Sequence, residues 1–498
     1  MSGMNKYKFA KVTQNVDLTS CAVTRLLRQV RIVALTSLIS LTLTACGSNK
    51  SAHYNAEPSD KPLVKQPNII YIFADDWGWG DLSVHGNKQV KTPNIDKLAA
   101  EGTDFYQFSV SSPVCSPSRA AVMTGQFPSR NNINQHFATI EHHERAGMPD
   151  WLDSKAEMLP RILKNAGYAT AHFGKWHLTN VQIKDAPLPT EYGYDEYGAF
   201  NLPGYNMPPS ETATQAIDFI KRHKDQPFFV NLWIHETHTP HYPEPALMKE
   251  NEHLNEQNML YSAIIAAGDR DVGKIMALLK ELNIDDNTLV IFSSDNGPEV
   301  TGERKFMDDD STGPGFGTFY SVGKTLGLKG AKRSLYAGGV RVPFIARWPG
   351  VVPAGVIDKK SVLNAVDLLP TFADLAGATL PSKYVSDGES IRLALSGETF
   401  TRSKVMYWVW PPGKGSKSTA TPNWPNYGIQ SGDWKLLVND SLEIEELYQV
   451  KEDWYEKTNV AEQHPNVVQA LRAEMLRLQQ EFPTTIPEHV KSTLRNKG

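Results

Sequence analysis

The chain has 498 residues, with 51 Lys and Arg against 55 Asp and Glu and a formal charge of −4. Its 40% hydrophobic and 21% charged residues are typical of a globular protein, which excludes a disordered, collagenous or fibrous chain. Three cysteines are too few for a disulfide framework. The mildly acidic balance gives no reason to expect a nucleic-acid partner.

The first 45 residues have the features of an export signal in the expected order. Six basic residues and one acidic residue lie within residues 1–31, and an apolar run follows from Ile32 to Leu43. The run is short for a membrane-spanning anchor, which is the alternative interpretation. Leu43-Thr44-Ala45-Cys46 resembles the lipobox of bacterial lipoproteins, in which Cys46 carries the lipid. We therefore expect a lipoprotein signal peptide over residues 1–45.

Export would change the whole-chain figures. Removal of residues 1–45 leaves 45 basic and 54 acidic residues, a formal charge of −9. The polar stretch 46–66 is expected to act as a flexible tether. Of the two cysteines that remain, Cys46 would carry the lipid and Cys115 would be free for chemistry. The prediction is an exported protein that is lipid-anchored to the bacterial envelope, in the outer membrane or facing the periplasm.

The body of the chain alternates predicted strands with predicted helices. Apolar runs at 68–73, 228–234 and 288–292 favour strands buried on both faces. Helices are expected from Pro93 to Gly102, near 158–166, and over 259–282. This alternation predicts a layered α/β domain over residues 67–395, with a large, mostly parallel or mixed sheet between helices.

The pattern changes after about residue 395. Short strand-like runs at 405–410, 427–430, 434–438 and 444–448 precede one amphipathic helix. Residues 396–498 are therefore predicted to form a smaller C-terminal subdomain with an antiparallel sheet and a helix. Two long Gly/Pro-rich connections, 183–210 and 300–327, are candidate substrate loops.

Oxygen-bearing side chains stand directly after two of the buried strands. The pairs are Asp75-Asp76 and Asp295-Asn296, while His235 and His238 follow the strand between them in the chain. Ligands bind beyond the carboxyl ends of strands in open α/β sheets, so these groups are expected to converge. Oxygen donors without cysteine pairs indicate Ca²⁺ or Mg²⁺ rather than zinc. The alternative is that Asp and Asn only cap turns.

Three further motifs carry reactive groups. Cys115 stands before a predicted helix, with Arg119 in the same motif, and Lys175 lies two residues before His177. Taken singly, each has a plain structural reading: a buried cysteine, a hydrogen-bonded histidine and, for Lys332, a solvated basic loop.

Together these residues resemble the type I, formylglycine-dependent sulfatases. The signature is Cys115-Ser116-Pro117-Ser118-Arg119 with Thr124-Gly125 behind it. It is accompanied in order by Asp75-Asp76, Gly174-Lys175-Trp176-His177, His238-Thr239-Pro240, Ser294-Asp295-Asn296-Gly297 and Lys332. The resemblance covers about residues 66–480 and implies an alkaline-phosphatase-like fold.

The resemblance also implies a mechanism. Cys115 would be converted to formylglycine by a formylglycine-generating enzyme and would complete a Ca²⁺ site with Asp75, Asp76, Asp295 and Asn296. Arg119, Lys175, His177, His238 and Lys332 would surround the sulfate. His238 or Lys332 would protonate the departing alcohol, and His177 would take the proton from the second hydroxyl of the hydrated aldehyde. Gln126 and Ala337 depart from the family pattern, which more often has Arg and Glu there.

The expected substrate is a sulfated polysaccharide or its oligosaccharides, since an exported lipoprotein meets polymers. The resemblance is nearest to sulfatases that act on marine carrageenan or ulvan. Candidate sugar and sulfate contacts are Trp408, Trp410, Trp424 and Tyr427, with Lys414 and Lys417. The alternative for the aromatic residues is that they pack the small sheet against the main domain. The His-rich segment 131–150 is a candidate wall of the cleft. Two alternatives stay open: a metal-dependent phosphatase or phosphodiesterase of the same superfamily, and a non-catalytic polysaccharide-binding lipoprotein.

Overall fold

The computed structural model describes residues 66–204, 207–301, 321–411, 424–439 and 443–496. The predicted export signal, nearly all of the predicted tether, most of the 300–327 connection, and Lys414 and Lys417 lie outside these residues. No helix in the described part of the chain is both long enough and apolar enough to cross a membrane.

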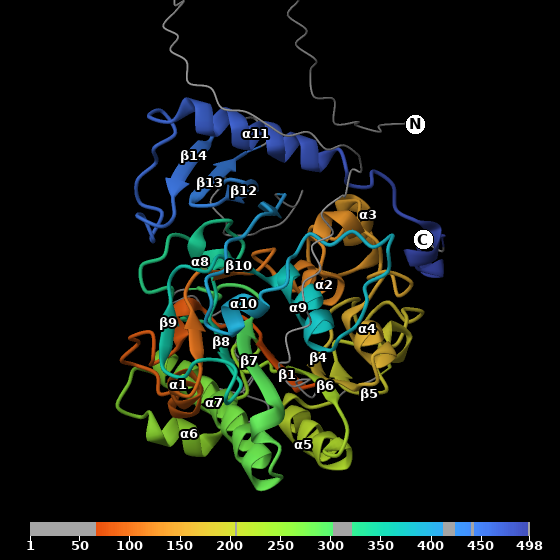
Figure 1. The fold of residues 1–498 in the computed structure, drawn as a ribbon, viewed down its shortest axis with the longest axis vertical. Helices are drawn as coiled ribbons and strands as arrows, with labels where there is room; N and C mark the ends of the chain where they lie inside the picture. The colour runs from red at the N-terminus through yellow and green to blue at the C-terminus, as the bar shows by residue number, and fades with distance from the viewer. Residues whose placement is uncertain (1–65, 205–206, 302–320, 412–423, 440–442, 497–498) are drawn as a thin grey trace, which may run out of the picture. The chain divides into compact units, whose positions relative to one another are not determined.

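An eight-stranded mixed sheet forms the centre of residues 62–498, which make one compact unit (Figure 1). Five adjacent strands run parallel, whereas β8 pairs antiparallel with both β7 and β2. In spatial order the strands are β5 (Glu196–Phe200), β4 (Ala169–Lys175), β6 (Phe228–Trp233), β1 (Asn68–Ala74), β7 (Thr288–Ser294), β8 (Phe344–Arg347), β2 (Thr103–Phe105) and β9 (Val356–Asp358). A two-stranded parallel sheet, β3 (Phe108–Ser109) with β10 (Leu363–Asn364), lies apart from it.

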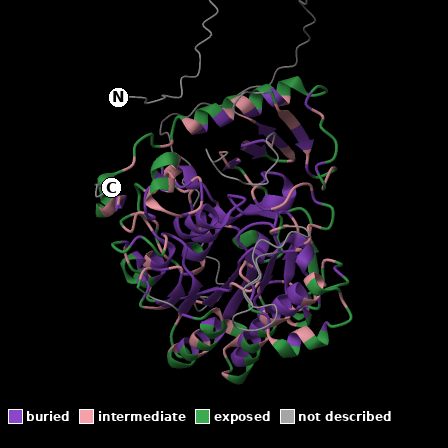
Figure 2. Cartoon of the chain, turned by 180° about the vertical axis from the view of Figure 1, so that it is seen from behind, coloured by how far each residue is buried: buried purple, intermediate pink, exposed green. Residues whose placement is uncertain are grey.

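Helices cover both faces of this sheet because β1 is apolar on both sides. Ile70 and Ile72 join the core under α1 (Pro93–Ala100), α5 (Thr212–His223) and α7 (Glu256–Glu281). Ile69 and Tyr71 point to the other face, because successive strand side chains alternate. That face is packed by α2 (Cys115–Thr124), α4 (Leu159–Asn165) and α9 (Leu368–Leu375). Most strands of this sheet are buried, the edge strand β9 being an exception, while α1, α5 and α7 expose one side (Figure 2).

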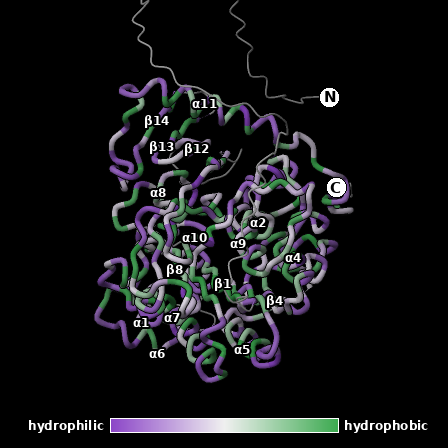
Figure 3. The backbone as a smooth tube through the Cα atoms, viewed as in Figure 1, coloured by the Kyte–Doolittle hydropathy of each residue, from purple (hydrophilic) through white to green (hydrophobic). Residues whose placement is uncertain are grey.

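The C-terminal part contains a regular antiparallel sheet. Its order is β11 (Met406–Val409), β12 (Tyr427–Ser431), β13 (Trp434–Val438) and β14 (Glu445–Gln449). Helix α11 (Pro465–Gln479) packs Val468, Leu471, Met475 and Leu478 into an apolar cluster with β12 and β13. Most of the residues between them are exposed, and the colours of α11 in Figure 3 alternate between hydrophilic and hydrophobic. Shorter helices are α3 (Ile140–Ala146), α6 (Pro245–Glu250), α8 (Ala337–Val340) and α10 (Arg392–Leu395).

The predicted fold class is confirmed: a mixed, mostly parallel sheet between helices, and a smaller antiparallel sheet with a helix. For Trp408 the structure decides between the two interpretations in favour of packing. Its side chain is only 1% exposed, so it is not available for sugar stacking. Its indole N–H donates to the carbonyl of Val110 at 2.7 Å, so Trp408 holds the small sheet against the main body. Trp410, Trp424 and Tyr427 are partly exposed.

Candidate active site

The carboxyl ends of β1 and β7 meet at the centre of the sheet. Ala74 pairs with Ser294 at the end of their register, which places Asp75 beside Asp295. The backbone N–H of Asp76 donates to Asp295 Oδ1 at 3.1 Å, and the Asn296 amide donates to Asp76 Oδ1 at 2.6 Å. Asp76 has a φ of +64°, a left-handed conformation that Asp tolerates better than most residues. The four predicted oxygen ligands therefore lie together.

These side chains fit a cation of the kind that prefers oxygen. One carboxylate oxygen each from Asp75, Asp76 and Asp295 lies within 4.8 Å of the others, and all three residues are buried. Asp75 Oδ1 and Asn296 Oδ1 are buried without a hydrogen-bond partner. Burial and the neighbouring Asp75 raise the pKa of Asp295 to about 7. Three close carboxylates repel one another when all are ionised, and a divalent ion bound between them would favour the charged form of each.

Three buried cations lie against the same carboxylates: Lys175, Lys332 and Arg119. Lys175, the last residue of β4, places Nζ 2.6 Å from Asp75 Oδ2. Lys332 places Nζ 2.5 Å from Asp76 Oδ2 and 3.6 Å from a carboxylate oxygen of Glu299. Burial alone would raise the pKa of Asp75, but Lys175 above all holds it well below its usual range. The edge is thus rich in both charges, and the cations could also meet an anionic substrate.

Helix α2 carries the signature residues into this cluster. Cys115 is its first residue, and Arg119 lies one turn later on the same face. The guanidinium of Arg119 donates to Asp295 Oδ2 from Nη2 at 2.6 Å and to the Lys175 carbonyl from Nη1 at 3.0 Å. Cys115 is 4% exposed, and burial raises the pKa of its thiol. An unmodified Cys115 is therefore a protonated thiol and a poor nucleophile.

The hydrogen bonds of His177 define its tautomer. Nε2 lies 3.0 Å from the carbonyl of Phe137, and because a carbonyl only accepts, Nε2 carries the proton. Nδ1 has no partner and is buried. Burial, followed by the charge of Lys175, lowers the pKa of His177 well below its usual value. His177 is therefore a neutral imidazole with a free lone pair at Nδ1, and its φ of +50° holds that orientation.

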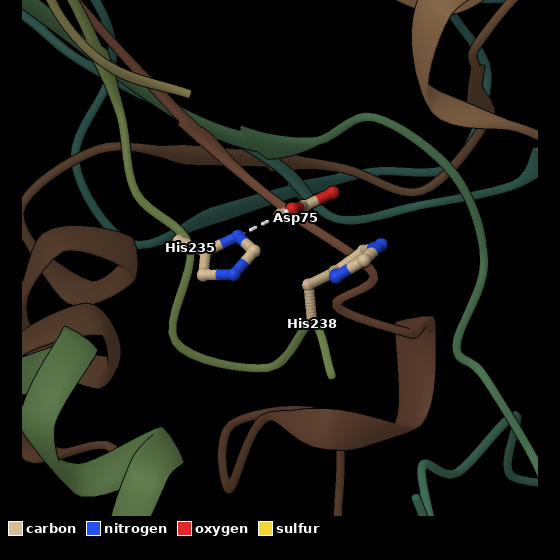
Figure 4. Close-up of side chains that lie close together, drawn as sticks. All are labelled: Asp75, His235 and His238. Atoms are coloured by element: carbon tan, nitrogen blue, oxygen red, sulfur yellow. Dashed lines mark hydrogen bonds and ion pairs between the residues drawn. The ribbon is translucent and has the colours of Figure 1, made fainter. Parts of the chain in front are cut away.

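Two histidines from the loop after β6 lie beside Asp75 (Figure 4). His235 Nδ1 is 2.8 Å from Asp75 Oδ2, and the His235 and His238 rings stack with centroids 5.0 Å apart. His238 Nε2 is 4.0 Å from Asp76 Oδ2. Sequence reasoning favoured His238 over His235; the structure brings both to the site and leaves His241 buried nearby in the same loop. The direct contact of His235 with Asp75 was not foreseen.

A cavity of about 490 Å³ opens beside His235. Its walls are both polar and apolar and include Phe200, Asn201, Met207 and Tyr242. A second cavity of about 340 Å³ shares His235, Pro240 and Tyr242 with the first, and adds five charged residues: Glu236, Glu244, Arg270, Asp271 and Lys274. Parts of the predicted loop 183–210 thus line a cavity next to the site.

Several contacts at the site had no signal in the sequence. Glu299 pairs with both Lys332 and Arg333, and the N–H of Phe137 donates to the Ser116 hydroxyl at 3.0 Å. His136 is largely buried, and burial together with nearby cationic side chains lowers its pKa to about 3. The sequence marked segment 131–150 only by its histidines, because contacts made by backbone groups leave no residue pattern.

Comparisons with known proteins agree with this geometry. Residues 67–378 match the Sulfatase family, and residues 330–481 match the family described as N-sulphoglucosamine sulphohydrolase, C-terminal. N-acetylgalactosamine-6-sulfatase from Canis lupus familiaris is 33% identical over 388 residues, covering 69% of this chain and 68% of the relative. The human enzyme of that name is 31% identical over 424 residues, covering 72% and 73%.

The fold also matches solved structures. The crystal structure of Ps i-CgsB in complex with k-i-k-neocarrahexaose superposes with a TM-score of 0.71 and 27% identity. The match covers 85% of this chain and 94% of that one.

Proposed function

This chain belongs to the sulfatase family and is a sulfuric ester hydrolase; on that premise we propose that it removes sulfate from a sulfated polysaccharide or its oligosaccharides, with Ca²⁺ and a formylglycine made from Cys115. The observation that carries the proposal is the convergence of α2, three buried carboxylates and three buried cations at one edge of the sheet. In the proposed enzyme the hydrated formylglycine supplies a hydroxyl nucleophile, and Ca²⁺, held by Asp75, Asp76, Asp295 and Asn296, supplies positive charge.

The cations of this site have the task of neutralising the sulfate. A sulfate ester resists attack because its oxygens carry negative charge, and preorganised positive groups lower that barrier. Arg119 is fixed by Asp295 and by the rings of Trp233 and Phe73, 4.9 and 5.6 Å from its guanidinium carbon. Lys175 and Lys332 are each held by a carboxylate, so they need no reorganisation to meet the substrate.

A proton must reach the departing alcohol, and two groups are placed to donate it. The neighbouring Asp76 and Glu299 raise the pKa of Lys332 despite its burial, so Lys332 carries a proton. His238 donates from Nδ1 to its neighbour's carbonyl at 2.5 Å, and burial with Lys175 lowers its pKa. His238 would have to gain a proton at Nε2 before it could act. Lys332 therefore holds the available proton in this arrangement, with His238 the other candidate.

The second proton transfer is assigned to His177. Nδ1 has no partner and carries the only nitrogen lone pair of that side chain. It would accept the proton from the second hydroxyl of the hydrated formylglycine, and the loss of that proton lets sulfate depart. His177 is unprotonated at Nδ1, as a proton acceptor must be.

A sulfated glycan is the substrate class that the surroundings of the site favour. The cavity beside His235 has the size of a small-molecule site, and Phe200 and Tyr242 offer aromatic faces. Relatives are named for N-acetylgalactosamine 6-sulfate, and one structural neighbour holds k-i-k-neocarrahexaose. A carrageenan or ulvan fragment is the finer proposal.

The test has two parts. Mass spectrometry of the Cys115 peptide, from a host with a formylglycine-generating enzyme, should show conversion of the thiol to the aldehyde. Sulfate release should then be measured on carrageenan, ulvan and glycosaminoglycan oligosaccharides. An unmodified thiol in an active preparation contradicts the proposed nucleophile, and release from none of the glycans contradicts the substrate class.

One observation favours a second candidate, a metal-dependent phosphatase or phosphodiesterase. Asp75, His235 and His238 place one ligand atom each within 4.8 Å, a donor set that suits a transition metal. Against it, the ammonium of Lys175 lies 2.6 Å from the same Asp75 oxygen that His235 contacts. Phosphate-ester turnover that requires Zn²⁺ and survives Cys115→Ala would favour this candidate.

Export and lipid anchoring remain part of the proposal. Residues 1–46 support it only through their sequence pattern. Labelled palmitate should enter the wild-type protein in a bacterial host and not Cys46→Ser, and the variant should leave the membrane fraction. Equal labelling of both forms contradicts Cys46 as the lipid-bearing residue.

A further inference from the structure

The backbone of Phe137 connects helix α2, which begins at Cys115, to His177. Its N–H donates to the hydroxyl of Ser116, the residue after Cys115, at 3.0 Å. Its carbonyl accepts from His177 Nε2, also at 3.0 Å. The first contact fixes where Phe137 lies relative to the nucleophile, and the second fixes the tautomer of His177. A displacement of this one peptide would therefore alter both the orientation and the protonation of the imidazole.

The peptide after Phe137 is held by a buried histidine. The N–H of Ala138 donates to His143 Nε2 at 2.7 Å, so Nε2 is the unprotonated nitrogen. The proton is then on Nδ1, which donates to Asp150 Oδ1 at 2.7 Å. His143 and Asp150 are both fully buried. This pair has the form of a carboxylate that orients an imidazole, used here on a backbone N–H.

Asp150 is anchored by a segment more than 340 residues away in the chain. Arg495 donates to Asp150 Oδ2 from Nε at 2.6 Å and to Oδ1 from Nη2 at 3.0 Å. The N–H of Ser492 donates to Oδ2 at 2.7 Å. The carbonyl of Asp150 accepts from the hydroxyl of Thr179, two residues after His177, at 3.0 Å. Asp150 thus reaches His177 by two routes, through His143 and through Thr179.

We propose that Arg495, Asp150 and His143 are positioning residues for His177. They hold the Phe137 peptide so that its carbonyl keeps the proton of His177 on Nε2 and leaves the lone pair on Nδ1. This inference rests on the proposed function, because the role of His177 does. It assigns the segment around Arg495, in a 3₁₀ turn over Thr493–Asn496 remote from the chemistry in sequence, to the set of groups that determine turnover.

The cost of the arrangement argues against simple packing. Burying a carboxylate, an imidazole and a guanidinium is often no more stabilising than apolar side chains of the same volume. What the polar set supplies is direction: each of its hydrogen bonds has a defined donor and acceptor from Arg495 to Ala138. A defined donor and acceptor at each contact is what keeps the His177 imidazole in one orientation and one tautomer.

The first test compares two substitutions of His143. Gln can accept from Ala138 and donate to Asp150, whereas Phe can do neither. If His177 acts after the alcohol has left, His143→Phe should lower kcat by about 10- to 100-fold and lower KM in parallel, so that kcat/KM changes less than about twofold. His143→Gln should recover most of kcat. A fall of kcat and kcat/KM together at constant KM, in both variants, would indicate lost folded enzyme and overturn the proposal.

A matched control lies in the same C-terminal segment. His489 pairs with Asp153 at 2.8 Å, but the pair is partly exposed and has no contact with Phe137 among those observed. His489→Gln should leave kcat and KM unchanged. A loss as large as that of His143→Phe would mean that any disturbance of this segment suffices.

A second variant covers the case in which His143→Phe fails to fold. A crevice of about 480 Å³ is lined by Arg495, Glu144 and Lys491, and it opens the Arg495 site to small ions. Arg495→Ala should lose kcat about 10-fold or more, and millimolar guanidinium should restore part of it without changing wild-type turnover. Absence of rescue, with the variant folded, would overturn the proposed link from Arg495.

A readout independent of turnover separates this inference from the proposed function. In ¹⁵N-histidine NMR, wild-type His177 should show the Nε2–H tautomer, and Arg495→Ala should show a mixture. If the wild-type protein released no sulfate but the tautomer still depended on Arg495, the positioning would stand and the function would fall. An unchanged tautomer would overturn the positioning alone.

Discussion

Two buried lysines, one at each sheet, show how differently the same charge is used. Lys435, in β13, donates to Glu456 at 2.6 Å and to the Leu335 carbonyl at 2.8 Å, and Glu456 also accepts from the N–H of Ala337. Lys332 lies against Asp76 and Glu299 at the catalytic edge, where the carboxyl ends of β1 and β7 meet. In the same cluster Asn296 Oδ1 has no hydrogen-bond partner, and Asp75 Oδ1 has only the guanidinium of Arg119, 3.3 Å away. The C-terminal pair is a closed connection between two parts of the fold. The catalytic edge is left open for a ligand.

The difference extends to buried polar atoms and not to backbone conformation. At the catalytic edge Asp75, Asn296 and His177 each have a buried atom without a hydrogen-bond partner. Left-handed residues occur in both regions, since Glu456 has a φ of +56° and Asp76 one of +64°. The C-terminal sheet pairs in regular antiparallel register from Tyr427 to Gln449 among the described residues. Unsatisfied groups are tolerated where a ligand will meet them. Each prediction below tests one side of this contrast.

The largest effect is expected at Cys115. Cys115→Ala should lower turnover by about 10⁴-fold or more, since the proposed nucleophile is lost. The fold should stay intact because the side chain is small and the cations around it keep their carboxylate partners. Sulfate release and circular dichroism check the two halves. Near wild-type release would remove Cys115 from the mechanism, while Cys115→Ser reports which residues the maturation enzyme accepts.

Removal of the metal should come next. Chelation should abolish sulfate release and lower the melting temperature, and added Ca²⁺ should restore both. Bound Ca²⁺ at 100 times its Kd would contribute about 2.7 kcal/mol to stability. Asp295→Asn should weaken the Ca²⁺ dependence of melting, which is measurable without substrate. A melting temperature indifferent to chelator and to Ca²⁺ would mean that the carboxylates are satisfied by their lysine and arginine partners alone.

At the other sheet the expected loss is in stability. Lys435→Met leaves Glu456 buried without its cation and should cost about 3–5 kcal/mol in urea denaturation. The kcat of the folded fraction should be unchanged. The control is Lys329→Met, since Lys329 is a partly exposed lysine 3.1 Å from Glu446, and it should cost less than about 1 kcal/mol. Equal losses would erase the distinction between the buried and the exposed pair.

The last effect is absent at neutral pH and concerns acid stability. His172 is buried among the rings of Trp176, Trp233 and Tyr194, and burial lowers its pKa to about 3. The unfolded chain takes up a proton near pH 6.5, so stability is full above that pH and falls as the pH drops toward 3. His172→Phe should flatten this fall by about 1.4 kcal/mol per pH unit. Denaturation curves at several pH values measure the slope, and an unchanged slope would mean that His172 is charged in the folded state.

Much of the fold was predictable because its central strands are apolar on both faces. The runs at 68–73, 228–234 and 288–292 became β1, β6 and β7, and the long helix was placed within a few residues. Strand β4 was missed because Thr170, His172 and Gly174 interrupt its apolar residues. The reversed direction of β8 is set by its pairing with β7, and such pairing has no local signal.

The site was predictable to the extent that it is written in side chains after strands. The sequence placed Asp75, Asp76, Asp295 and Asn296 together, and the structure brings them together. The contacts of the Phe137 backbone and the anchoring of Asp150 by Arg495 were not foreseeable. They depend on backbone groups and on residues more than 300 positions apart, which only the folded chain brings into contact.

The order of strands in the large sheet also determines when the site can form during synthesis. The central strand β1 ends at residue 74, but its partner β7 begins 214 residues later, at Thr288. During synthesis the edge that encloses Cys115 cannot close before Asn296 has emerged and β7 has paired with β1. Before β7 pairs with β1, Cys115 is in an incompletely folded chain to which a modifying enzyme can bind. In the folded protein Cys115 is 4% exposed. The slow, long-range closure of the sheet thus leaves an interval in which the cysteine can be modified.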